Sequence, residues 1–167
     1  MEEGSSVTAG CGSGSTYCPD AGATRAQMAV FLLRSKKGLC YTPPPATGTV
    51  FSDVPANSFA AAWIEALAAE GVTTGCGGGM YCPNSTVTRA QMAVFLLRML
   101  EGSAYSPPPC TAATFNDVPC SNPFAPWIEE LVHRGITAGC GSGMYCPNNP
   151  VTRGQMAVFL STTFGLP

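Results

Sequence analysis

The strongest constraint on the fold of this chain is an internal repeat with a period of 64 residues, because a repeated sequence predicts a repeated structural unit. The hexapeptide Gln-Met-Ala-Val-Phe-Leu begins at Gln27, Gln91 and Gln155. A Thr-Arg pair precedes each copy and a Cys-Pro pair lies further upstream, both with the same step. At this period the 167 residues hold about 2.6 copies. We therefore expect stacked repeat units rather than one large irregular domain.

The missing part is the front of the first copy. The motif Phe-x-Asp-Val-Pro begins at Phe51 and Phe115, and Trp-Ile-Glu begins at Trp63 and Trp127. Neither motif precedes Cys11, so we expect the chain to be a fragment or a processed form of a longer protein. The predicted units are a partial repeat over residues 1–42 and complete repeats over residues 43–106 and 107–167.

Each complete repeat predicts two helices joined by a glycine-rich loop. Trp63, Ile64 and Leu67 have the spacing of one helical face over residues 60–70, and we expect them in the core. Thr88 opens the second helix with a Thr-Arg-Ala-Gln capping box, followed by apolar residues at helical spacing. Runs of three prolines separate the repeats and predict extended connectors. The expected fold is all-α, built from tandem helix-loop-helix repeats.

Composition excludes several function classes. The net charge is −2, whereas a nucleic-acid-binding protein needs a basic footprint. The longest apolar run is far shorter than the roughly 18 residues of a membrane helix. Nine cysteines are unusual for a cytosolic enzyme and favour an oxidising, extracellular location, although the N-terminus lacks the pattern of a secretory signal.

The cysteines divide into repeated pairs and extras. Two flank each glycine loop, and these pairs are Cys11 with Cys18, Cys76 with Cys82, and Cys140 with Cys146. Cys110 and Cys120 stand where the second repeat has Ala46 and Ala56, which indicates a fourth disulfide. Cys40 is left over, and an odd cysteine in an exported protein indicates an intermolecular bond or a free thiol.

Metal binding is the competing interpretation of the loop cysteines. Zinc needs four ligands at closer Cys spacing, usually with histidines, and His133 is the only histidine. We favour disulfides and predict no metal and no cofactor.

One repeated charged position stands out as a candidate site. Arg25, Arg89 and Arg153 each follow the first residue of a capping box, where a cation opposes the helix dipole. Two roles are open. The arginines could contact a carboxylate or phosphate of a ligand or partner, or they could be structural, either in an ion pair or bound to carbonyl groups that tie down the neighbouring glycine loop. Asp53 and Asp117 of the Asp-Val-Pro motifs are interpreted as turn or capping residues.

The order of these motifs resembles the S-layer homology repeat. The matching elements are Phe51-x-Asp53-Val54, Trp63-Ile64-x-x-Leu67, Gly71-Val72-x-x-Gly75, Tyr81-x-Pro83 and Val87-Thr88-Arg89-Ala90-Gln91. The third repeat shows the same order, and the first repeat matches from its glycine loop onward.

The resemblance implies a compact helical unit with pseudo-threefold symmetry that anchors surface-layer proteins and exoenzymes to the cell envelope. It implies an anionic, often pyruvylated, cell-wall polysaccharide as the ligand, with Arg25, Arg89 and Arg153 in the binding grooves. This chain departs from the family in three ways. Glutamine replaces the family's glutamate in every capping box, disulfides close the loops, and the first repeat lacks its first helix, so we expect one groove to be incomplete.

Three function classes follow. We favour a non-catalytic extracellular structural protein that self-assembles head to tail into a surface layer or filament, because the chain consists of repeats alone and Cys40 could cross-link neighbours. The alternative is a cell-wall polysaccharide-binding anchor module of a larger exported protein or enzyme. No nucleophile, base and orienting acid come together in the motifs, so we do not predict an enzyme.

Overall fold

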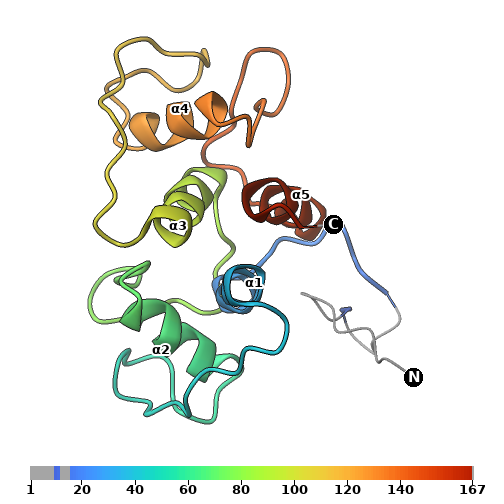
Figure 1. Ribbon diagram of the computed structural model, residues 1–167, viewed down its shortest axis with the longest axis vertical. Coiled ribbons are helices and arrows are strands. Elements are labelled where there is room, and N and C mark those ends of the chain that lie inside the picture. The colour runs from blue at the N-terminus through green and yellow to red at the C-terminus, as the bar shows by residue number, and fades with distance from the viewer. Residues whose placement is uncertain (1–9, 12–15, 167) are drawn as a thin grey trace.

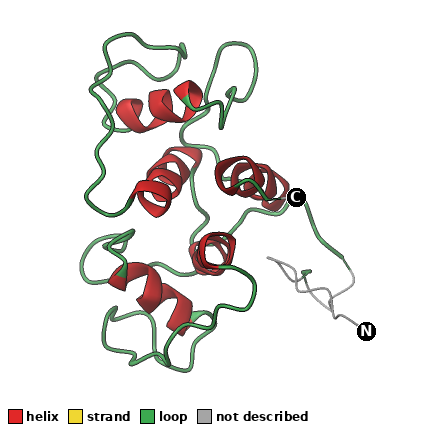
Figure 2. Cartoon of the chain, viewed as in Figure 1, coloured by secondary structure: helices red, strands yellow, loops and turns green. Residues whose placement is uncertain are grey.

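The computed structural model describes residues 10, 11 and 16–166. It contains five helices: α1 (Arg25–Lys37), α2 (Ala61–Ala69), α3 (Arg89–Glu101), α4 (Ala125–His133) and α5 (Arg153–Phe164). The rest of the described chain is loops and isolated β-bridges, so the all-α prediction is confirmed (Figure 2). The front of the predicted partial repeat, residues 1–9, lies outside the described residues, as do residues 12–15 of its glycine loop.

Capping boxes define where the three longer helices begin. At α1, Thr24 Oγ1 accepts a hydrogen bond from the Gln27 amide at 3.2 Å, and Gln27 Oε1 accepts from the Thr24 amide at 3.1 Å. The same reciprocal pair of hydrogen bonds forms at the start of α3 and of α5. Each box satisfies two amide groups that a helix start would leave unpaired. The predicted caps are therefore confirmed.

The three longer helices contact one another, and the shorter helices lie outside them (Figure 1). α1, α3 and α5 pack pairwise, while α2 packs on α1 and α4 packs on α3. Within the described part of the chain, no helix packs on α5 as α2 and α4 pack on their partners. The units therefore resemble one another in their central helix but differ in how the outer face of that helix is covered.

Main-chain hydrogen bonds join the repeats into a closed ring. The amide of Ala23 donates to the carbonyl of Val151 at 2.8 Å, Val151 donates to Val87 at 2.8 Å, and Val87 donates to Ala23 at 3.0 Å. These three residues are 64 positions apart along the chain. The first and third repeats therefore meet directly, which gives the pseudo-threefold arrangement that the family resemblance implies.

The core is formed by apolar side chains of the helices and of the segments before and after them. Ile64 and Leu67 of α2 are fully buried, as predicted. Trp63 and Trp127, which we expected in the core, are instead half-buried and packed against its edge. Each ring faces a cation, and a cation is best accommodated at the edge of the core: the Trp63 ring lies 5.2 Å from the Arg34 guanidinium, and the Trp127 ring lies 5.5 Å from that of Arg98.

The connectors between repeats are held by two glutamates. The Glu65 carboxylate accepts hydrogen bonds from the amides of Thr47 at 2.8 Å and Gly48 at 2.7 Å. Glu129 accepts from the Thr114 amide at 2.8 Å in the next repeat. These main-chain bonds lower the pKa of Glu65, chiefly through Thr47. The glutamate of each Trp-Ile-Glu motif thus attaches the first helix to the connector before it.

All four predicted disulfides are formed, and Cys40 is the free, exposed cysteine of the described residues. Among residues 10, 11 and 16–166, no group of three or more histidine, cysteine or acidic residues gathers as a metal site would require. None of the described helices combines the length and apolar character of a membrane-spanning segment.

Candidate functional site

The repeated arginines are buried and bind the glycine loop of another repeat. Arg25 is 3% exposed, and its Nε donates to the carbonyl oxygen of Tyr81 at 2.7 Å. In return the Tyr81 hydroxyl donates to the carbonyl oxygen of Arg25 at 2.8 Å. This reciprocal clamp ties the start of α1 to the loop that follows α2.

The clamp recurs around the ring. Arg89 pairs with Tyr145 through bonds of 2.7 and 2.9 Å, and Arg153 pairs with Tyr17 through bonds of 2.9 and 3.0 Å. The structural role predicted for these arginines, a bond to loop carbonyls, is therefore observed. The arginines also line surface grooves, so this structural role is compatible with contact with a polymer. That contact stays a prediction.

Aromatic rings enclose each guanidinium. The Arg25 guanidinium carbon lies 4.7 Å from the Tyr81 ring centre and 5.5 Å from that of Phe95. Cations are attracted to such ring faces. Nη2 of Arg25, and likewise Nη2 of Arg89, is buried without a hydrogen-bond partner among the described residues. An oxygen atom from a water or a ligand would satisfy this group.

Burial also sets the protonation of the clamp. Desolvation lowers the pKa of Arg25, and the nearby Tyr81 and Asp53 partly oppose this shift. Desolvation raises the pKa of Tyr81, and it raises the pKa of Tyr145 to about 12. Both tyrosines therefore stay protonated at neutral pH and serve as donors.

An aspartate and a disulfide hold the loop on which the clamp depends. Asp53 accepts from the amides of Tyr81 and Cys82, both at 2.7 Å, and Asp117 does the same for the third repeat. Cys82 has a left-handed φ of 60°, which costs energy for a residue with a Cβ. Asp53, which we expected only as a turn or capping residue of its own segment, therefore caps a loop that is distant in the sequence. Its bond to the Tyr81 amide and the adjacent disulfide position the carbonyl that Arg25 binds.

Each arginine lines a groove beside the central helix of the next repeat in the ring. We name the grooves by that helix. Each is lined by an arginine, by a glutamine, a valine and a phenylalanine of the helix, and by a loop glycine. The α1 groove has Arg153, Gln27, Val30, Phe31 and Gly10; the α3 groove has Arg25, Gln91, Val94, Phe95 and Gly75; the α5 groove has Arg89, Gln155, Val158, Phe159 and Gly139.

Two grooves contain a second arginine that the sequence reasoning missed. Arg34 lines the α1 groove, and Arg98 lines the α3 groove, where its guanidinium lies 5.5 Å from the Trp127 ring. Thr162 stands at the equivalent position of α5. The repeat pattern contains these two arginines, because Arg34 and Arg98 are 64 residues apart. Their place beside a tryptophan 29 residues further on was not visible in the sequence.

The α5 groove is the incomplete one. Val158 is 62% exposed, whereas its counterparts Val30 and Val94 are half-buried beneath neighbouring segments. Ser161 occupies the position of the fully buried Leu33 and Leu97. The outer face of α5 is therefore both uncovered within the described chain and more polar than that of α1 or α3.

Known proteins have sequences similar to these repeats. A model of the S-layer homology domain matches residues 50–93 and 114–157. Endo-1,4-beta-xylanase A of Thermoanaerobacterium saccharolyticum is 35% identical over 111 residues, which cover 65% of this chain and 9% of that protein. An S-layer protein of Bacillus thuringiensis subsp. finitimus is 29% identical over 125 residues, 75% of this chain and 15% of that protein. A cellulosome-anchoring protein of Acetivibrio thermocellus is 29% identical over 84 residues, 50% of this chain and 19% of that protein.

This chain spans only a small part of its relatives. It covers 9%, 5% and 11% of a xylanase, an amylopullulanase and an endoglucanase.

Proposed function

The chain belongs to the S-layer homology family, and we propose that its grooves bind an anionic polysaccharide of the cell wall. Its relatives include S-layer, cell-surface and cellulosome-anchoring proteins, so the predicted cell-surface location is confirmed. We take each 64-residue repeat as one helix-loop-helix unit that contributes one groove. The proposed role is attachment, with no reaction assigned to the repeats.

The observation that carries this proposal is the recurrence of one groove chemistry at three places around the ring. Every groove has an arginine and a glutamine above an apolar floor, and no acidic residue is among its described lining residues. Arginine suits carboxylate recognition through its planar array of donors. The unpartnered Nη2 atoms of Arg25 and Arg89 are consistent with a ligand oxygen in two of the grooves.

Three grooves on one closed ring suit a polymeric ligand. A long polysaccharide presents many copies of its repeating unit, so binding at one groove raises the effective concentration of ligand at the others. Attachment to a wall then needs no single tight site. The amide groups of the groove glutamines, held in place by the capping boxes, offer donors near the arginines.

The test is retention of the purified chain on isolated cell-wall polysaccharide. We expect binding that weakens as salt is raised and that is largely lost after the carboxylates of the polymer are converted to amides with carbodiimide. Amidation changes the ligand and leaves the protein folded, so it separates recognition from stability. A chain that is not retained, or that binds the amidated polymer equally well, would overturn the proposal.

Self-assembly, the interpretation favoured from sequence, is a second proposal that rests on a different observation. Cys40 is exposed and free, and the outer face of α5 exposes Val158. It ranks second because the hydrogen bonds between repeats close within one chain. Sedimentation of the chain and of Cys40→Ser at high concentration under oxidising conditions tests it. Assemblies that disappear with Cys40→Ser would support assembly, and monomers in both samples would contradict it.

A further inference from the structure

We propose that the α1 groove is the principal polysaccharide site. In this proposal one saccharide ring stacks on Phe59 and lies between two arginines that line the groove. This inference rests on the proposed function and goes beyond it, because it assigns a residue and ranks the grooves. Phe59 lies outside the repeated arginine motif and precedes α2.

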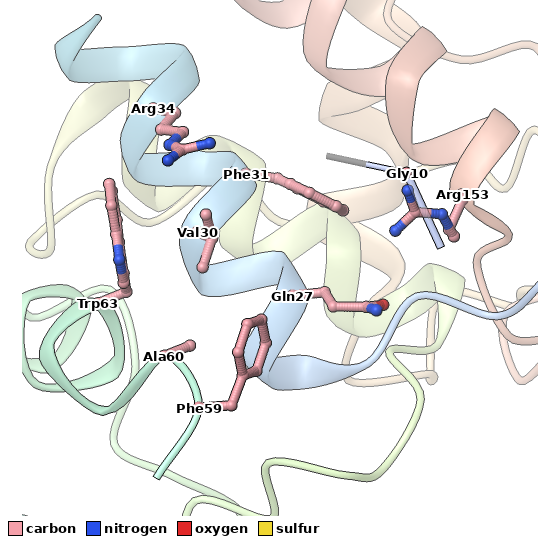
Figure 3. Close-up of a pocket in the computed structure, with 9 residues that line it drawn as sticks. All are labelled: Gly10, Gln27, Val30, Phe31, Arg34, Phe59, Ala60, Trp63 and Arg153. Atoms are coloured by element: carbon pink, nitrogen blue, oxygen red, sulfur yellow. The ribbon is translucent and has the colours of Figure 1, made fainter. Parts of the chain in front are cut away.

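The exposure of Phe59 is the first observation. Its side chain is 70% exposed, the highest value among the large apolar residues of the described chain. Ala60, the next residue, has a left-handed φ of 61°, which is unusual for a residue with a Cβ. Figure 3 shows the Phe59 ring standing beside Ala60 at the rim of the groove, on the side of Gln27. Exposure of the ring does not favour folding, and the left-handed residue beside it carries a further energetic cost, so we assign the ring a function in binding.

The surroundings of the ring indicate what would bind there. Arg34 and Arg153 both line the groove and approach it from different helices, α1 and α5 (Figure 3). Arg34 is held over Trp63, and Arg153 is held by its bond to the Tyr17 carbonyl. The cavity of about 430 Å³ has the size of a small-ligand site. The described lining thus combines an aromatic face with two guanidinium groups.

A saccharide bearing an acidic substituent matches this combination. The C–H groups on one face of a pyranose ring are apolar and pack on an aromatic ring, whose face carries negative charge density. Hydroxyl groups around the sugar can accept from the Gln27 amide and the arginines. A carboxylate substituent would meet Arg34 or Arg153, depending on the direction in which the polysaccharide runs through the groove.

The other grooves lack the combination. The residue 64 positions after Phe59 is Pro123, which has no aromatic face. Phe124 lines the α3 groove, but it is half-buried and its cavity is about 150 Å³. The α5 groove has one arginine among its described lining residues and no aromatic residue from a neighbouring helix. Affinity should therefore be greatest at α1.

Calorimetric titration with solubilised cell-wall polysaccharide fragments tests this ranking. We expect Phe59→Ala to raise the Kd about tenfold, Phe59→Tyr to stay near wild type, and the matched control Pro123→Ala to leave the Kd unchanged. Because Phe59 is exposed, its removal should leave the thermal unfolding midpoint in place, which is measured on the same samples.

The outcomes separate this inference from the proposed function. If wild type binds the fragments and Phe59→Ala binds equally well, the assignment of Phe59 is wrong while the proposed function stands. If wild type does not bind, both fail. If wild type sediments as a dimer and Phe59→Ala as a monomer, the ring is covered by a second copy, and the inference is overturned.

Discussion

Arg25 and Tyr81 are joined by two hydrogen bonds that run in opposite directions, from the arginine Nε to the tyrosine carbonyl and from the tyrosine hydroxyl to the arginine carbonyl. The two residues are 56 positions apart and belong to different repeats. Each bond is buried, so water does not compete for its donor or acceptor. The pair therefore fixes the start of α1 against the glycine loop of the next repeat, and it also presents the arginine to the α3 groove.

Replacement of Tyr81 by phenylalanine should destabilise the chain without disturbing its core. Tyr81→Phe removes the buried hydroxyl and its bond to Arg25, and it should lower the free energy of unfolding by about 1 kcal/mol. Urea denaturation followed by circular dichroism measures this loss. Tyr41→Phe is the matched control, because the Tyr41 hydroxyl forms no hydrogen bond within the described residues. Equal losses in the two variants would contradict the importance of the clamp.

The loop disulfide should contribute more to stability than its length predicts. Chain entropy assigns about 2 kcal/mol to the Cys76–Cys82 ring and slightly more to the longer Cys110–Cys120 ring. Cys82 also carries the left-handed backbone next to Tyr81, so loss of its disulfide should loosen the clamp as well. We expect the double serine variant of Cys76 and Cys82 to lose more stability in urea than that of Cys110 and Cys120. The reverse order would show that the disulfides act through the unfolded chain alone.

Sequence reasoning succeeded where the partners are close along the chain. The capping box of Thr24 and Gln27 spans three positions, and the loop disulfide of Cys76 and Cys82 spans six, so their spacing alone identifies them. The partner of Arg25 lies 56 positions away, and that of Arg153 lies 136 positions away across the closed ring. Those pairs depend on how the repeats meet, which no local pattern specifies.

The tryptophans and Phe59 show a second limit. Helical spacing places Trp63 on the same face as buried Ile64, but it does not say what covers each residue. Arg34, from another helix, packs over the Trp63 ring at the edge of the core. Phe59 has no counterpart at its repeated position, where Pro123 stands, so the repeat pattern does not identify it.

Stability should fall in acid because of Glu130. Its carboxylate accepts from Arg134 Nε at 2.7 Å and from the Tyr105 hydroxyl at 3.0 Å, and the Arg134 bond is the main cause of its lowered pKa. A carboxyl group whose pKa is lower in the folded than in the unfolded protein stabilises the fold above its unfolded pKa, about 4.3. That stabilisation is lost as pH falls through the folded value. We expect the urea midpoint of wild type to drop on acidification through this range and that of Glu130→Gln to drop less. Parallel curves would exclude Glu130 as the cause.

Two glycines of one loop should respond differently to the same substitution. Both have positive φ, 94° at Gly75 and 109° at Gly77, so alanine is strained at either position by roughly 1–2 kcal/mol. A Cβ at Gly75 would also lie 2.2 Å from the carbonyl oxygen of Met80 and 3.0 Å from the Phe51 ring, whereas a Cβ at Gly77 meets no atom within 4 Å. The Met80 carbonyl accepts from the Cys76 amide inside the disulfide ring, so it cannot move without opening the loop. Gly75→Ala should therefore lower the thermal midpoint clearly more than Gly77→Ala. Equal effects would mean that the loop shifts freely, and the wall that Gly75 gives to the α3 groove would then be adaptable rather than fixed.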